Sequence, residues 1–132
     1  MKKMLLLVLA AVLAISAVCF AQSSANAEGY QKITPQQAKA RMAESGVIVL
    51  DVRMQQEYDA GHIANAVLLP LPLIETGDAA VAKALPDKDT EILIYCRSGR
   101  RSAIAANALI NMGYTNVLDF GGINDWPYEV VK

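Results

Sequence analysis

Short apolar runs without polar alternation recur along the chain. The segments VIVLD (47–51) and EILIY (91–95) are continuous runs of strand length. Because a strand without alternation is covered on both faces, such runs are typical of a parallel sheet between helices. Shorter runs near Val67 and Val117, together with 31–33, predict three further strands.

Helical segments alternate with these strands. Thr34 and Pro35 are suited to be the cap and first residue of one helix, and Gly113 is suited to end another. The alternation predicts an α/β fold, a parallel sheet of about five strands flanked by helices on both faces. The predicted helices run from Pro35 to about Glu44, over 55–60, over about 74–84 and over 102–112.

The amino-terminal segment has the form of a secretory signal. Lys2 and Lys3 precede an apolar run over 4–21, and the small residues ANA predict cleavage after Ala27. Cleavage after Ala21 is the other option. An uncleaved anchor is the alternative, because the run approaches the roughly 20 apolar residues that span a bilayer.

Cleavage would define the exported protein. We expect a signal peptide over 1–27 and one compact domain over 28–132, with the periplasm as destination and no stable membrane insertion after cleavage. Of the 12 basic residues, loss of two lysines leaves ten against 13 acidic ones, a net charge of about −3. This balance does not indicate nucleic acid as a partner.

The cysteine content directs attention to one residue. Cys19 leaves with the signal, so the mature chain keeps only Cys96 and cannot form an internal disulfide. A lone thiol in an oxidising compartment is either buried and inert or kept for its reactivity. Cys96 follows the apolar run 91–95, at the carboxyl end of a predicted strand, where open α/β sheets bind ligands.

The loop after this cysteine is rich in arginine. Arg97, Arg100 and Arg101 surround a strand-to-helix turn in which Gly99 permits tight closure. Loop amides and the positive helix end would form an anion cradle, and nearby positive charge favours thiolate over thiol. Arginine at a helix amino end is electrostatically unfavourable by about 0.3–1 kcal/mol, so three of them indicate a function. The alternative is an inert core cysteine with solvated arginines.

Three segments in order resemble signatures of the rhodanese family. DVRMQQEYDAGHIANAVLLP (51–70) is similar to the amino-terminal signature, YCRSGRRS (95–102) to the active-site loop and LDFGGINDW (118–126) to the carboxyl-terminal signature. Asn65 stands where a glycine is usual, and asparagine tolerates left-handed backbone geometry. The resemblance covers nearly all of the mature chain and implies a rhodanese-like domain over 28–132.

The resemblance implies sulfur transfer. Cys96 would take a sulfane sulfur from a small anionic donor such as thiosulfate, hold it as a persulfide, and pass it to a thiophilic acceptor, cyanide or a thiol. No metal or organic cofactor is expected. Arg97 is the first candidate for binding the donor, Arg100 the second, and Arg101 either binds it or is structural. The implied substrate-binding residues are Arg97, Ser98, Gly99, Arg100 and Arg101, with loop support from Asp51, Arg53 and Ser102.

Other conspicuous residues receive structural interpretations. We expect Asp51 to bond loop amides or Arg53, and His62, the only histidine, to secure its loop. Trp126 is expected in the core. Two other functions stay open: a cysteine-dependent phosphatase or arsenate-handling enzyme, and a non-catalytic binding module with the same fold. The first typically has an arginine six positions after the cysteine, where this chain has Ser102, and the second usually lacks the cysteine.

Overall fold

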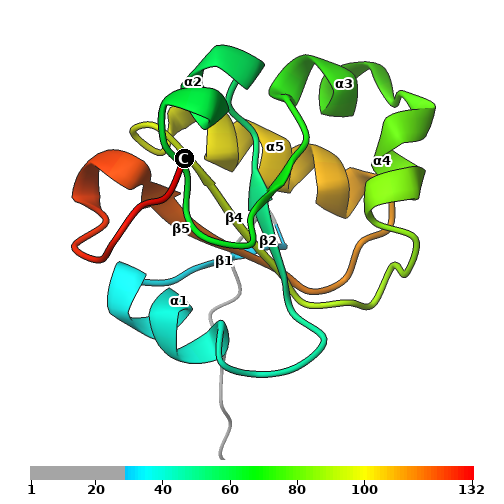
Figure 1. Ribbon diagram of the computed structural model, residues 1–132. Helices are drawn as coiled ribbons and strands as arrows, with labels where there is room; N and C mark the ends of the chain where they lie inside the picture. Colours follow the sequence, from blue (N-terminus) through cyan, green and yellow to red (C-terminus); the bar gives the residue numbers. More distant parts are fainter. Residues whose placement is uncertain (1–28) are drawn as a thin grey trace, which may run out of the picture.

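The computed structural model describes residues 29–132, so the predicted signal peptide lies outside the described residues and stays a prediction. Within this range five parallel strands form one sheet in the order β1-β5-β4-β2-β3, which confirms the predicted α/β class (Figure 1). The strands are β1 (Gln31–Lys32), β2 (Ile48–Asp51), β3 (Val67–Leu68), β4 (Ile92–Cys96) and β5 (Val117–Gly122). The helices are α1 (Pro35–Arg41), α2 (Gln55–Ala60), α3 (Leu71–Thr76), α4 (Ala79–Ala84), α5 (Arg100–Asn111) and the 3₁₀ helix η1 (Ile123–Asp125).

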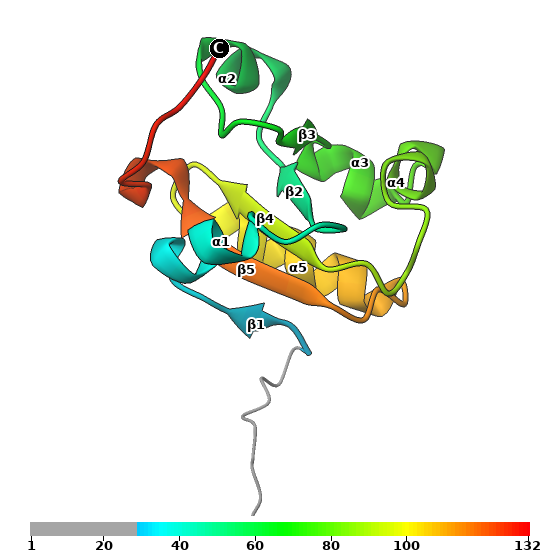
Figure 2. The same cartoon turned by 60° about the horizontal axis from the view of Figure 1, so that its bottom comes forward.

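Apolar side chains cover both faces of the sheet. Along β4, Ile92, Ile94 and Cys96 belong to the core beneath α3, α4 and α5, whereas Leu93 and Tyr95 belong to the core beneath α1. Figure 1 shows α1 on one side of the sheet and α5 on the other, and Figure 2 shows β1 and β3 at the two edges. The continuous apolar runs of the sequence therefore correspond to strands buried on both faces.

Two predicted helices differ from the observed ones by more than two residues, whereas α5 starts two residues before the predicted 102. Helix α1 has the expected cap, since the Thr34 hydroxyl accepts a bond from the Gln37 amide at 3.0 Å. It ends at Arg41 rather than near Glu44, because the following turn uses i to i−3 hydrogen bonds, including one from the Glu44 amide to the Arg41 carbonyl at 2.9 Å. These shorter-range bonds do not continue an α-helix.

The single helix predicted over 74–84 is wrong: the structure has α3 and α4 instead. Gly77 ends α3 with a left-handed φ of 69°. The Asp78 carboxylate then starts α4 by accepting a bond from the Ala80 amide at 2.8 Å. The break thus combines a glycine at a helix carboxyl end with an N-cap aspartate, both of which are ordinary helix boundary signals.

An irregularity in the sheet lies directly at the carboxyl end of β4. Ile94 pairs with Asp119, but Cys96 pairs with Gly122, so β5 has one extra residue between these pairs. Gly121 has a φ of 93° in this bulge. A bulge bends its strand locally, and this one brings Gly122 beside Cys96 and beneath the loop that follows it.

Within residues 29–132, none of the helices combines the length and hydropathy needed to span a bilayer.

Candidate functional site

Cys96 occupies the last position of β4, where strand gives way to loop. Its side chain is buried, with 1% of its surface exposed. The Gly99 amide donates a hydrogen bond to Cys96 Sγ over 3.0 Å. Gly99 has a left-handed φ of 103° and is the residue before α5, so the loop turns back over the sulfur at the amino end of that helix. The resting thiol therefore has one amide donor of the predicted cradle, and contacts of the other loop amides with a bound sulfur stay a prediction.

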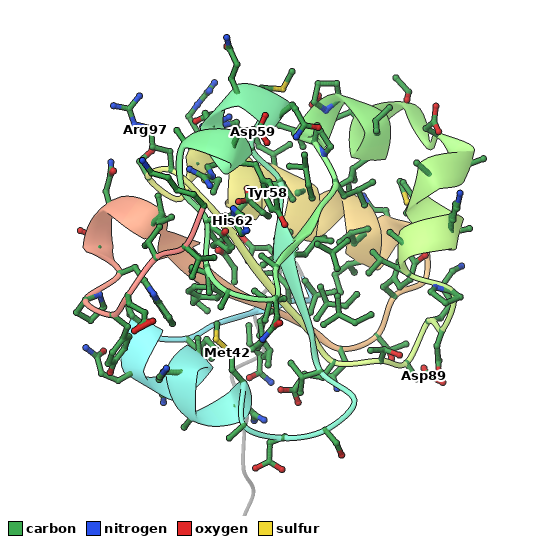
Figure 3. All side chains as sticks on the ribbon, viewed as in Figure 1. Met42, Tyr58, Asp59, His62, Asp89 and Arg97 are labelled. Atoms are coloured by element: carbon green, nitrogen blue, oxygen red, sulfur yellow. The ribbon has the colours of Figure 1, made fainter. Side chains whose placement is uncertain are left out.

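The rim of the site carries exposed positive charge. Arg97, Ser98 and Arg100 lie in the turn after Cys96, and Figure 3 shows Arg97 projecting away from the body of the molecule. The side chains of Arg97 and Arg100 are both exposed. Among residues 29–132, neither takes part in an ion pair. Their charges are therefore available to an anion approaching Cys96.

Arg101 differs from its two neighbours because it has a carboxylate partner. Its guanidinium donates from Nη1 to Glu57 Oε1 at 2.8 Å and from Nη2 to Oε2 at 2.9 Å. These bonds join the start of α5 to α2. They lower the pKa of Glu57 from 4.5 to about 2. The pair thus contributes fully to stability above about pH 4.5, and this contribution is lost as the pH falls towards 2.

The rear of the loop rests on the bulge of β5. A Cβ at Gly122 would lie 2.6 Å from Ser98 Cα, so the loop backbone approaches this strand as closely as only glycine allows. The Asn124 amide donates to the Arg97 carbonyl at 3.1 Å. The Ser102 hydroxyl, fully buried, faces the carbonyls of Gly99 and Gly121 at 3.2 and 3.4 Å. Backbone contacts therefore hold the loop from behind.

Asp119 supports the same bulge. Its carboxylate accepts a bond from the Gly121 amide at 2.9 Å and is almost fully buried. Burial raises the pKa of Asp119, while the hydrogen bond from the Gly121 amide opposes that rise. Sequence reasoning did not select Asp119, Gly122 or Glu57 as parts of the site. The segment LDFGG contains the first two, and the acidic-aromatic pair Glu57-Tyr58 contains the third.

A second polar cluster lies at the neighbouring strand end and is closed to solvent. The Asp51 carboxylate accepts bonds from the Arg53 backbone amide and from its guanidinium Nε and Nη2, the last at 2.8 Å. It also accepts from the Tyr95 hydroxyl at 2.6 Å. Burial of Tyr95, reinforced by Asp51, raises the pKa of that hydroxyl. Both kinds of partner expected for Asp51 are therefore present, a loop amide and the Arg53 guanidinium, and both belong to Arg53.

The cluster anchors the connection that follows α2. Arg53 Nη2 donates to the Gly61 carbonyl at 2.7 Å, and the Ile63 amide donates to the Tyr95 hydroxyl at 3.1 Å. Between Gly61 and Ile63, the backbone of His62 forms a bridge with Val131 near the carboxyl terminus. The connection is therefore held by both β4 and the end of the chain.

His62 itself faces α2. Its ring stacks on Tyr58 with the centroids 3.7 Å apart, and Nδ1 lies 2.9 Å from the Tyr58 carbonyl. A carbonyl only accepts, so Nδ1 carries the proton in this bond. These contacts place His62 in the packing of the connection. Asn65, a little further on, has a φ of 70°, the left-handed geometry that the sequence led us to expect there.

Within the described range, no group of three His, Cys, Asp or Glu is placed to hold a metal ion.

The fold and the site together define a class: an open parallel α/β domain with a cysteine in a strand-to-helix turn. The family model described as the rhodanese-like domain matches residues 34–128. The chain therefore belongs to the rhodanese family of sulfurtransferases.

Two curated relatives and one solved structure illustrate the similarity. The thiosulfate sulfurtransferase PspE of Escherichia coli (strain K12) is 36% identical over 83 residues, covering 63% of this chain and 77% of that protein. The thiosulfate sulfurtransferase GlpE of Pseudomonas entomophila is 36% identical over 98 residues, covering 74% of this chain and 84% of that protein. A solved rhodanese with anions from E. coli is 35% identical, with a TM-score of 0.59, covering 65% of this chain and 98% of that one.

Proposed function

We propose that this protein is a thiosulfate sulfurtransferase that carries sulfur on Cys96. The observation that supports this most directly is the position of Cys96 at the end of β4, with the Gly99 amide on its sulfur. The rim adds two arginines that form no ion pair among residues 29–132. The arrangement provides a nucleophile, a donor for negative charge on sulfur and an attraction for anions.

In the first half-reaction the Cys96 thiolate attacks the outer sulfur of thiosulfate. A sulfur–sulfur bond forms to Cys96, the sulfur–sulfur bond of thiosulfate breaks, and sulfite leaves with the electron pair. Arg97 and Arg100 attract the dianion to the rim. The Gly99 amide donates to the cysteine sulfur, whose negative charge changes during this step. A donor already in position for such a charge stabilises it without having to reorganise.

In the second half-reaction the acceptor attacks the terminal sulfur of the persulfide. Cyanide would become thiocyanate, and a thiol would become a persulfide, while Cys96 leaves as thiolate and is ready for another donor. No redox partner is needed, since the donor supplies sulfur already in the transferable state. The proposed reaction is a double displacement with one covalent intermediate.

The experiment that tests this proposal compares the wild type with Cys96→Ser. We expect the intact mass of the wild type to rise by one sulfur atom after thiosulfate treatment and to return after cyanide, with thiocyanate formed. Cys96→Ser should keep the fold, because serine differs little in volume from cysteine, and should lose both effects. Sulfur transfer near the wild-type rate in Cys96→Ser would contradict the mechanism.

A phosphatase assay provides the opposing outcome. The wild type should show negligible hydrolysis of an aryl phosphate, because the loop has Ser102 rather than arginine six positions after Cys96. Robust hydrolysis of the aryl phosphate that depends on Cys96 would contradict sulfur transfer. It would show that the site catalyses phosphoryl transfer instead.

We also propose that the protein is exported to the periplasm after signal cleavage. The supporting feature is the sequence of 1–27, with its basic start, apolar run and small residues before Glu28. Amino-terminal sequencing of the isolated protein should begin at Glu28. A chain that begins at Met1 and is recovered with membranes would contradict export and favour the anchor.

A further inference from the structure

The ion pair between Arg101 and Glu57 joins two segments that are 44 residues apart in the sequence. Both oxygens of Glu57 face the two terminal nitrogens of Arg101, at 2.8 and 2.9 Å, in a bidentate arrangement. The Glu57 side chain is held further because Oε1 also accepts a bond from the Met54 amide at 3.0 Å. The pair is partly shielded, with 27% of Arg101 and 28% of Glu57 exposed. Its geometry is therefore defined by three hydrogen bonds.

The pair also lies within electrostatic reach of Cys96. The hydrogen bonds to Glu57 raise the pKa of Arg101, and the charges of Glu57, Cys96 and Asp51 add to this rise. Arg101 lies in the first turn of α5, directly after the loop of Cys96, so the charges of Arg101 and Glu57 both lie beside this loop. By contrast, Arg97 and Arg100 are exposed and have no carboxylate partner among the described residues.

We propose that Glu57 sets the anion affinity of the donor site, because it neutralises Arg101 and leaves Arg97 and Arg100 as the loop arginines without a carboxylate partner among the described residues. This inference rests on the proposed function, since the donor in question is the anion that reacts with Cys96. Glu57 lies on α2, outside the loop, and lowers the positive charge that an incoming anion meets there.

The charge balance also affects product release. Thiosulfate and sulfite are both dianions, so an uncancelled third arginine would hold the leaving product as well as the incoming donor. Uniform binding of this kind lowers the Michaelis constant without accelerating the chemical step. Glu57 thus limits affinity for dianions in general and keeps sulfite from occupying the site.

The other charged groups near Cys96 keep their hydrogen-bond partners when Glu57 is replaced. Asp51 and Arg53 neutralise each other in a buried pair at 2.8 Å, and Asp119 lies behind the loop on β5. The hydrogen bonds of both carboxylates go to groups other than Arg101. A change at Glu57 therefore breaks a contact with Arg101 and leaves the hydrogen bonds of these carboxylates in place.

Glu57→Gln is the variant that tests the proposal, because glutamine keeps an oxygen for Arg101 and for the Met54 amide while the charge is lost. Asp59→Asn is the matched control. It removes the same charge from α2 (Figure 3), but its carboxylate bonds to the Gln55 side chain at 2.9 Å and not to an arginine. Any difference between the two variants therefore reports the contact with Arg101.

We expect the Michaelis constant for thiosulfate to fall at least about threefold in Glu57→Gln, the range of one partly exposed ion pair. Inhibition by sulfite should strengthen in parallel. Asp59→Asn should stay near the wild type. An unchanged or higher Michaelis constant in Glu57→Gln, or the same fall in Asp59→Asn, would overturn the proposal.

A pair of further variants separates charge balance from direct contact. Arg101→Met leaves Glu57 uncompensated, so the Michaelis constant should rise. The double variant Glu57→Gln, Arg101→Met has the same net charge as the wild type and should return towards the wild-type constant. If the double variant stays as impaired as Arg101→Met, Arg101 binds the donor directly and the charge-balance proposal is wrong.

Two measurements do not depend on turnover. Calorimetry with sulfate as probe should show tighter binding by Glu57→Gln than by the wild type or Asp59→Asn. The rate of alkylation of Cys96 by the anion iodoacetate should be higher in Glu57→Gln alone. If the wild type transfers no sulfur, the proposed function fails, yet these readouts still decide whether Glu57 sets the charge at Cys96. Equal values in all three proteins would overturn it.

Discussion

The adjacent strands β2 and β4 are each followed by an arginine, Arg53 and Arg97. The polar residues at the end of β2 are closed to solvent, whereas those after β4 are exposed. Asp51 and Tyr95 pair in register across the two strands. Arg53, after β2, is 5% exposed and bonded to Asp51 and to the Gly61 carbonyl. Arg97, after β4, is exposed and lacks an ion pair among the described residues. The arginine after β2 is thus buried and joins two segments by hydrogen bonds, whereas the arginine after β4 carries an exposed charge.

The difference lies in which groups meet the guanidinium. Burial lowers the pKa of Arg53, but hydrogen bonds to Asp51 and the nearby negative charge outweigh it, so the pKa is raised overall. A buried charge must be paired and hydrogen-bonded to be tolerated. In the loop after Cys96, the guanidinium groups of Arg97 and Arg100 are exposed to solvent. They lose hydration only when an anion binds to them. We therefore expect Arg53 to contribute to stability, and we propose that Arg97 attracts anions.

The largest expected effect is on stability, from breaking the closed end. Asp51→Ala leaves Arg53 buried and unpaired, and should cost about 3–5 kcal/mol in the free energy of unfolding. Urea unfolding measures this. Glu91→Ala is the control, since it breaks the exposed pair with Arg41 and should cost less than about 1 kcal/mol. Equal losses would show that the buried cluster contributes no more than a surface pair.

The next effect concerns the support of the open end. Gly122→Ala places a methyl group 2.6 Å from Ser98 Cα, so the loop must move away from β5. Displacement of a reacting group by about 1 Å can cost a hundredfold in rate, and we expect a loss of that order in thiosulfate:cyanide sulfur transfer. Gly121→Ala is the control, because its added methyl group would meet no neighbouring atom within 4 Å and only backbone strain is added. Similar activity in both variants would contradict the steric argument.

The smallest effect concerns the open charge itself. Arg97→Ala should raise the Michaelis constant for thiosulfate about tenfold, the equivalent of one charged contact of about 1.5 kcal/mol. Added salt should weaken thiosulfate use in the same direction, because an exposed charge is screened. Arg41→Ala, which removes a charge from α1 and its pair with Glu91, is the control and should leave the constant unchanged. No change in Arg97→Ala would mean that Arg97 takes no part in donor binding.

Much of the fold could be predicted because its signals are local. The apolar runs at 47–51 and 91–95 correspond to β2 and β4, and the cap at Thr34 to the start of α1. The break between α3 and α4 escapes the sequence prediction although Gly77 and Asp78 are local signals, because the apolar pattern continues through both helices. Where the two kinds of signal conflict, the glycine and the capping aspartate decide the structure.

The site was only partly predictable, because several of its contacts join distant segments. Sequence placed Cys96 at a strand end and its arginines in the next loop. It left open whether Arg101 binds the donor or is structural, since the partner Glu57 lies 44 residues away. The sequence also did not show the role of Gly122. A side chain is excluded at this position only because β5 passes directly beneath Ser98 in the folded protein.

The chain by itself determined the alternation of strands and helices, the cysteine, the loop and the family signatures, since each of these is written in neighbouring residues. The tertiary structure decided which charges are free. Three neighbouring arginines of the loop become two exposed cations and one neutralised by α2, because the fold brings Glu57 to Arg101 alone. Electrostatic balance depends on distances through space, and these exist only after folding.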